Sequence, residues 1–146
     1  MRTSDVPAVA ELEGVLFAEQ PWSARMLTDE LTLPGRYYLV AVGGAGGTAS
    51  GGAIVGYGGL ADFGVEAHIM TLGVRTDWQR AGLGGRLLAG LLAEADRRQV
   101  HQVLLEVAVD NAAARRLYTR AGFRPVGVRK GYYEATGTDA VVMARG

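Results

Sequence analysis

The chain begins with apolar residues at helical spacing, and residues that end helices then interrupt this pattern. Four of them form one stripe: Val9, Leu12, Leu16 and Phe17. Pro7 fits the first turn of a helix, because backbone N–H groups there make no hydrogen bond within the helix and proline lacks this group. The pattern therefore predicts a helix over residues 6–19. After a proline-containing break, Ser23 can cap a second helix, which we expect over residues 24–31.

The chain after the first two predicted helices consists mainly of compact apolar runs and two further amphipathic runs. The runs rich in β-branched and aromatic residues predict strands over 37–42, 53–63, 67–74, 103–109, 123–132 and 140–144. The amphipathic runs predict helices over 83–98 and 112–121, the second capped by Asn111 and ended by Gly122. The glycine-rich tract 43–52 has no side chains to bury, so we expect a loop there. This order predicts an α/β fold with a mixed sheet and about four helices.

Composition narrows the classes of function. A chain of 146 residues suits one domain, which we expect over 1–146. Fifteen basic and fifteen acidic residues cancel, so net charge gives no support for a nucleic-acid or membrane partner. The absence of cysteine excludes disulfides, thiolate metal ligands and a cysteine nucleophile. His68 and His101 lack partners at ligand spacing, so we expect no metal site. No apolar run approaches the roughly 18 residues of a membrane span, and we expect a cytoplasmic protein.

A glycine turn lies between the predicted strand 67–74 and the predicted helix 83–98. It reads Gln79-Arg80-Ala81-Gly82-Leu83-Gly84-Gly85. Backbone N–H groups converge at such a helix N-terminus and can bind an anion. The spacings G-x-G-x-x-G and G-x-x-x-x-G-K-[ST] of the nucleotide-binding loops are both missing. The remaining pattern, Q-R-x-G-x-G, resembles the pyrophosphate-binding loop of the GCN5-related N-acetyltransferases (GNAT), on which coenzyme A lies.

Three residues that could carry chemistry lie on the predicted strand 103–109 and on the helix that follows it. Glu106 shares a strand face with apolar residues. It could reach water or pair with an arginine, or it could be a general base made more basic by burial. Asn111 could be a plain N-cap or could hold a cofactor amide. Tyr118 could be a core aromatic or could protonate a departing thiolate, and all three residues could face one cleft.

Several short motifs share their order and spacing with a known family. They are Pro21-Trp22-Ser23, Leu105-Glu106-Val107, Asn111-Ala112-Ala113-Ala114, Leu117-Tyr118, Ala121-Gly122-Phe123-Arg124, Arg129-Lys130-Gly131-Tyr132-Tyr133 and Asp139-Ala140-Val141-Val142-Met143. Together they resemble the ribosomal-protein alanine N-acetyltransferase (RimI) family over nearly the whole chain. The resemblance implies the GNAT acyl-CoA N-acyltransferase fold, with a mixed, mostly antiparallel sheet whose central strands are splayed.

The resemblance also implies an activity and a role for each matched residue. The donor would be acetyl-CoA and the acceptor the N-terminal alanine of ribosomal protein S18, with direct transfer in a ternary complex. Glu106 matches the proton acceptor and Tyr118 the proton donor. The matched cofactor-binding residues are Leu72, Gly73, Val74, Arg80, Ala81, Gly82, Leu83, Gly84, Gly85 and Asn111. Trp22, Tyr132 and Tyr133 fall in segments that shape the peptide groove. We expect a monomer.

Two alternatives stay open at this point. The cofactor residues do not distinguish acceptors, so another protein N-terminus, a lysine side chain or a small amine could be the substrate. A module that senses acyl-CoA without turnover is a non-enzymatic alternative, against which Glu106 and Tyr118 argue because a sensor needs neither acid nor base. The pKa of an α-amine, about 7.7–8.0 against roughly 10.4 for lysine, favours N-termini at neutral pH.

Overall fold

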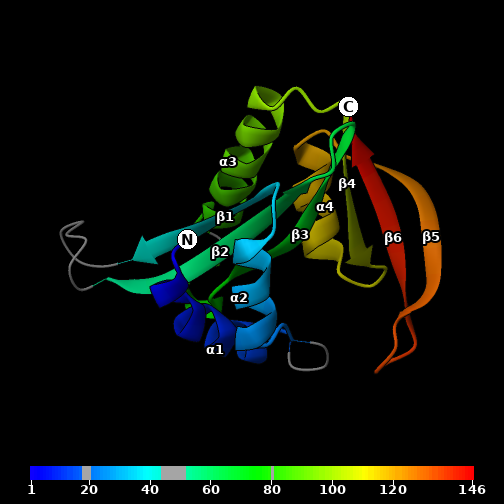
Figure 1. The fold of residues 1–146 in the computed structure, drawn as a ribbon. Helices are drawn as coiled ribbons and strands as arrows, with labels where there is room; N and C mark the ends of the chain where they lie inside the picture. Colours follow the sequence, from blue (N-terminus) through cyan, green and yellow to red (C-terminus); the bar gives the residue numbers. More distant parts are fainter. Residues whose placement is uncertain (18–20, 44–51, 80) are drawn as a thin grey trace.

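The computed structural model describes residues 1–17, 21–43, 52–79 and 81–146 (Figure 1). A six-stranded sheet has the order β1-β2-β3-β4-β6-β5. Its strands are β1 (Arg36–Gly43), β2 (Ala53–Asp62), β3 (Glu66–Val74), β4 (Gln102–Ala108), β5 (Arg124–Tyr133) and β6 (Thr138–Arg145). The helices are α1 (Val6–Leu16), α2 (Ala24–Thr32), α3 (Leu83–Arg97) and α4 (Ala112–Arg120). The predicted fold class and element order are confirmed.

Most predicted boundaries agree with the structure, and the caps explain why. The Ser23 hydroxyl accepts a hydrogen bond from the Met26 N–H at 3.1 Å and begins α2. The Asn111 side chain accepts one from the Ala114 N–H at 3.1 Å and begins α4. The predicted end of the first helix is wrong, because α1 stops at its Leu16. Residues 18–20 and most of the predicted loop 43–52 lie outside the described ranges.

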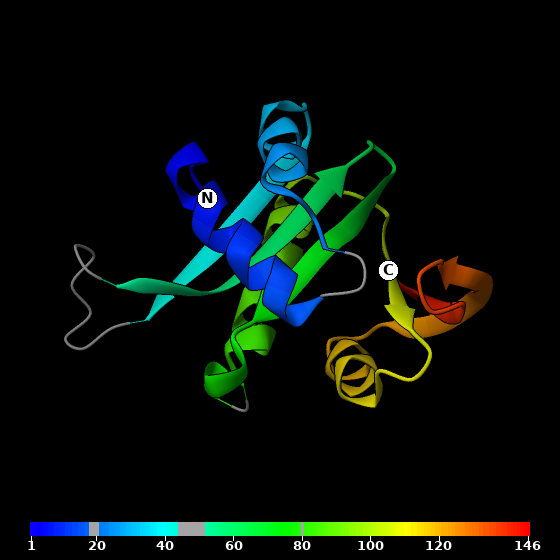
Figure 2. The same ribbon diagram turned by 90° about the horizontal axis from the view of Figure 1, so that it is seen from below.

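The helices cover opposite faces of β1, β2 and β3. Gly56 and Gly58 of β2 face α3, where Leu87 and Leu91 lie 2.9 and 3.0 Å from the position that a Cβ would take. These glycines therefore let α3 pack close to the sheet. Tyr57, between them, points to the other face and joins a buried cluster with α1 and α2. Figures 1 and 2 show α1 and α2 on one side of these strands and α3 on the other.

The centre of the sheet opens where β3 and β4 separate. These two strands run parallel, whereas the other neighbouring strands are antiparallel. Their pairing consists of Glu66–Gln102, Ala67–Val103 and His68–Leu104. A register shift between Gly59 and Leu60 of β2 leaves Met70 of β3 without a partner in β2, and such a bulge bends a strand. The predicted mixed, mostly antiparallel sheet with splayed central strands is confirmed.

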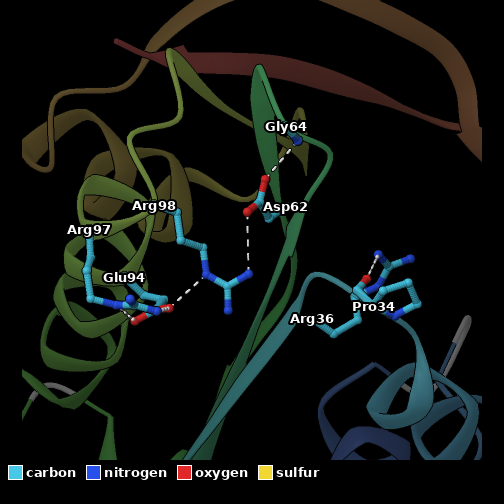
Figure 3. Close-up of polar contacts among 7 residues, drawn as sticks. All are labelled: Pro34, Arg36, Asp62, Gly64, Glu94, Arg97 and Arg98. Carbon is cyan, nitrogen blue, oxygen red and sulfur yellow. Dashed lines mark hydrogen bonds and ion pairs between the residues drawn. The ribbon is translucent and has the colours of Figure 1, made fainter.

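An ion-pair group ties the C-terminal end of α3 to the sheet (Figure 3). The Arg98 guanidinium donates to Glu94 of α3 at 2.7 Å and to Asp62 of β2 at 3.4 Å. The other oxygen of Asp62 accepts the Gly64 N–H at 2.8 Å and so fixes the turn into β3. Hydrogen bonds from Arg97 and Arg98 lower the pKa of Glu94 to about 2.

We expect Arg98→Gln to lower the free energy of unfolding by about 1 kcal/mol at neutral pH, because it removes two ion pairs at the protein surface. The pKa of Glu94 is lower in the folded protein than its unfolded value of 4.5. Its ion pairs therefore contribute their full stability above pH 4.5, and this contribution is lost as the pH falls towards 2. The difference between variant and wild type should therefore shrink over that range. Urea unfolding at several pH values measures this. Arg86→Gln, an exposed change on the same helix, is the control, and equal stability of Arg98→Gln and wild type at neutral pH contradicts the bridge.

Candidate active site

The opening between β3 and β4 leads into a cleft of about 710 Å³. Its walls come from the end of α1, the segment before α2, the middle of β3, the end of β4 with α4, and the connection from β5 to β6. Figure 2 shows α1 and β3 (blue and green) on one side of the molecule and β4, β5 and β6 (yellow to red) on the other. Seven predicted site residues line the cleft: Trp22, Leu72, Glu106, Asn111, Tyr118, Tyr132 and Tyr133.

The other predicted residues that the structure describes are not among those that line this cleft. Gly73 and Val74 are paired with Tyr57 and Gly56 of β2 at the end of β3. The described residues of the glycine turn, 81–85, lie at the N-terminus of α3. Arg80 lies outside the described residues. The structure thus separates the predicted anion loop from the predicted acid–base pair.

The N-terminus of α3 has the features of an anion site. Gly82 is its N-cap residue, with φ at +78°, a left-handed conformation that favours glycine. Among the described residues no side chain caps this helix, unlike α2 and α4, so these residues leave the N–H groups of its first turn room for an external acceptor. A Cβ on Gly84 would lie 3.5 Å from Leu117 of α4 and 3.8 Å from Val74. The loop therefore sits between α4 and the end of β3.

Glu106 lies on the face of β4 that opens on the cleft. Its neighbours Leu105 and Val107 are buried on the other face, whereas the Glu106 side chain is 19% exposed. The Nη1 atom of Arg129 in β5 pairs with the Glu106 carboxylate at 3.3 Å. The Arg129 guanidinium also lies 4.5 Å from the centre of the Tyr132 ring. The arginine-paired arrangement considered for Glu106 is therefore present, and the carboxylate lines the cleft as well.

Tyr118 is a buried aromatic residue that lines the cleft. It packs edge-on against Phe123, with ring centres 5.9 Å apart. Within the described part of the chain, no group makes a hydrogen bond to the Tyr118 hydroxyl. Burial first, and the nearby Tyr133 second, raise the pKa of Tyr118 to about 12. The phenol therefore stays protonated near neutral pH and can act as a proton donor.

Asn111 has the N-cap role considered for it, and it also lies at the cleft. Its side-chain oxygen caps α4, and the residue also lines the cleft. The amide nitrogen makes no hydrogen bond to the described residues. Asn111 thus has a structural role through one atom and a free donor through the other.

Aromatic side chains flank the cleft on the sides away from β3 and β4. Trp22 comes from the segment before α2, and Tyr132 and Tyr133 come from the end of β5. The two tyrosine rings are nearly perpendicular, with centres 5.0 Å apart. Burial is the main cause that raises the pKa of each tyrosine. All three side chains are half-buried and can contact an extended chain that enters the cleft.

Sequence reasoning missed five polar residues that also line the cleft: Glu13, Thr71, Asp110, Thr136 and Thr138. Glu13 had a detectable signal, because it follows Val9 by four residues and so lies on the apolar stripe of α1. A carboxylate on such a stripe needs a partner. The other four had no such signal. Within the described ranges no group of three or more metal-ligating side chains occurs, and no helix is long and apolar enough to cross a membrane.

The chain is similar to proteins of one family over most of its length. The model of the Acetyltransferase (GNAT) family matches residues 7–123. The chain is 39% identical to N-alpha-acetyltransferase RimI of Mycobacterium tuberculosis, over 97% of this chain and 87% of the relative. It is 34% identical to the Escherichia coli [ribosomal protein bS18]-alanine N-acetyltransferase, over 99% of this chain and 93% of the relative.

A solved structure extends the likeness to the fold. The crystal structure of the ribosomal-protein-S18-alanine N-acetyltransferase from Escherichia coli matches with a TM-score of 0.81 and 29% identity. The match covers 99% of this chain and 89% of that chain. The resemblance found in the sequence motifs is confirmed, and the chain belongs to the GNAT family of acetyl-CoA-dependent N-acetyltransferases.

Proposed function

We propose that this chain transfers the acetyl group of acetyl-CoA to the N-terminal alanine of ribosomal protein S18. The observation that carries the proposal is that Glu106 and Tyr118, a carboxylate and a protonated phenol, line one cleft where β3 and β4 separate. The names of the Mycobacterium tuberculosis and Escherichia coli relatives support an N-terminal acceptor. The aromatic side chains of Trp22, Tyr132 and Tyr133 suit a peptide better than a small amine.

We assign the donor to the two features beside the cleft. The uncapped N-terminus of α3, residues 81–85 with Arg80, would hold the diphosphate of coenzyme A. The end of β3, at Leu72, Gly73 and Val74, would hold the pantetheine and acetyl part through backbone groups. The free amide nitrogen of Asn111 would donate a hydrogen bond to the same ligand. The donor thus spans from the glycine turn to the splay.

The side chains of the cleft then supply acid–base chemistry. Glu106 accepts a proton from the α-ammonium group, directly or through water, and the free amine attacks the thioester carbonyl. Backbone N–H groups near Val74 stabilise the oxyanion. As the carbon–sulfur bond breaks, Tyr118 donates its proton to the leaving thiolate. The attached nitrogen, which is cationic after the attack, loses its second proton to solvent, and a proton from solvent restores the Tyr118 phenol. Transfer is direct in a ternary complex: the chain has no cysteine to carry the acetyl group, and we assign no hydroxyl or carboxylate to that role.

The acceptor preference has a physical basis in proton affinity. Removing a proton from an α-ammonium group, with a pKa of about 7.7–8.0, costs roughly 3 to 4 kcal/mol less at neutral pH than removing one from lysine. Before the acceptor arrives, Arg129 is the cation that pairs with Glu106. An incoming α-ammonium group presents the same charge to the same carboxylate.

We further propose that residues 1–146 form a single N-acetyltransferase domain. A monomer in the cytoplasm, without a nucleic-acid partner, remains a prediction.

We expect Glu106→Gln and Tyr118→Phe each to lower kcat by a factor of about 10²–10⁴ at neutral pH, because each removes one proton transfer. Steady-state kinetics with an alanine-initiated peptide measure this, with circular dichroism to check folding. Glu134→Gln and Tyr37→Phe are matched controls, since neither residue lines the cleft. Wild-type turnover in both folded site variants would rule out the assignment of acid and base.

The acceptor is tested by release of coenzyme A thiol with a panel of substrates. We expect the kcat/KM for an alanine-initiated S18 peptide to exceed those for serine- and methionine-initiated versions by about tenfold, or about 1.4 kcal/mol of activation free energy. A peptide with a blocked N-terminus and an internal lysine, and free amines, should react more slowly still. Faster reaction of the lysine peptide or of an amine would favour the other acceptor classes. Binding of acetyl-CoA with no thiol release from any acceptor would favour the sensor.

A further inference from the structure

A buried carboxylate on α1 connects segments on two sides of the cleft. Glu13 is 2% exposed. One carboxylate oxygen, Oε2, accepts hydrogen bonds from the Tyr57 hydroxyl and, at 3.4 Å, from the Thr71 hydroxyl. The other, Oε1, accepts the backbone N–H of Trp22 at 3.3 Å. The partners come from β2, β3 and the segment before α2, and none belongs to the acid–base pair.

Tyr57 carries this connection to the end of β3. It is fully buried and is the cross-strand partner of Gly73. A Cβ on Gly73 would lie 2.6 Å from the Tyr57 hydroxyl oxygen, so this hydroxyl fills the space beside the Gly73 backbone. Burial, and then the bond to Glu13, raise the pKa of Tyr57, which therefore remains a hydrogen-bond donor. Glu13 thus fixes a side chain that abuts the proposed donor site.

Trp22 carries the connection to the acceptor side. Its side chain lines the cleft, and its backbone lies between the end of α1 and the N-cap of α2 at Ser23. The hydrogen bond from the Trp22 N–H to Glu13 ties this segment to α1. The position of the Trp22 ring relative to β3 therefore depends on the Glu13 carboxylate.

Packing alone does not account for a carboxylate at this position. Val9 and Leu27, in the cluster next to Glu13, are fully buried, and an apolar side chain among them would avoid the cost of burying a charge. Burial raises the pKa of Glu13, which is the sign of that cost. The hydrogen bonds of the Glu13 carboxylate to Trp22, Tyr57 and Thr71 offset this cost.

We propose that Glu13 is a positioning residue for acetyl transfer: it holds Trp22 on the acceptor side and, through Tyr57, the Gly73 backbone on the donor side. The carboxylate thereby sets the separation between the amine and the thioester. This inference rests on the proposed function, which assigns the donor to the end of β3 and the peptide to the groove at Trp22.

Glu13→Gln tests the proposal, because it keeps the shape of the side chain but leaves only one oxygen to accept hydrogen bonds. We expect kcat with the alanine-initiated peptide to fall at least tenfold and the peptide KM to rise about threefold to tenfold, since small misplacements of reacting groups cost large factors in rate. Tyr57→Phe removes only the link to β3, so we expect a similar fall in kcat with an unchanged peptide KM. Glu11→Gln, an exposed change on the same helix, is the control.

The split between kcat and KM separates positioning from a structural role. All kinetics are measured well below the thermal midpoint of each variant, where a purely structural residue would leave both constants unchanged. The double variant should lose no more kcat than Glu13→Gln alone, because both changes break one connection. If folded Glu13→Gln has the kcat and KM of the wild type, this inference is overturned while the proposed function stands. If Glu13→Gln does not fold, the same result in Tyr57→Phe overturns it. No reaction of wild type with the peptide would overturn the proposed function and this inference together.

Discussion

The short parallel pairing of β3 and β4 is the constraint on which the site depends. Three residue pairs join the strands, and beyond His68 and Leu104 they separate. A strand that leaves its neighbour exposes N–H and C=O groups that need other partners. The bulge at Met70 bends β3 at this point, so the opening is built into the strand itself. The sheet therefore provides both a space for substrates and backbone groups that can bind them.

The packing on either face of β2 fixes the parts of the site around that opening. Gly56 and Gly58 let α3 lie close to the sheet, which places its uncapped N-terminus next to the end of β3. Tyr57, on the opposite face, meets Glu13 of α1 and abuts Gly73. One strand thus determines, through alternate residues, where the N-terminus of α3 lies and how the end of β3 is supported.

Local sequence patterns predicted most of the fold and part of the candidate site. The contacts between residues far apart in the chain could not be predicted. The strands agree to within two residues, because alternation and turn residues are local signals. The spacing of Glu106, Asn111 and Tyr118 on one strand and the next helix was enough to predict that they face one cleft. The Arg129–Glu106 pair joins residues 23 positions apart, and Glu13 bonds to partners 44 and 58 positions away. Such pairings depend on the register and bend of the sheet, which the sequence pattern does not specify.

The arrangement separates chemistry from acceptor recognition. The assigned base and acid come from β4 and α4, consecutive elements whose relative position is set by a short turn. The aromatic walls come from the segment before α2 and from β5, which lie far apart in the chain and reach the cleft independently. On the proposed function, a substitution at Trp22 can therefore change the acceptor without moving Glu106 or Tyr118. The β5 wall is coupled to the base, because Tyr132 contacts Arg129, the partner of Glu106. Glu13 adds a second coupling, because its single carboxylate bonds both to the backbone of Trp22 and to Tyr57, which supports the end of β3. On the proposed positioning role, a change at Glu13 therefore affects the acceptor and donor sides together.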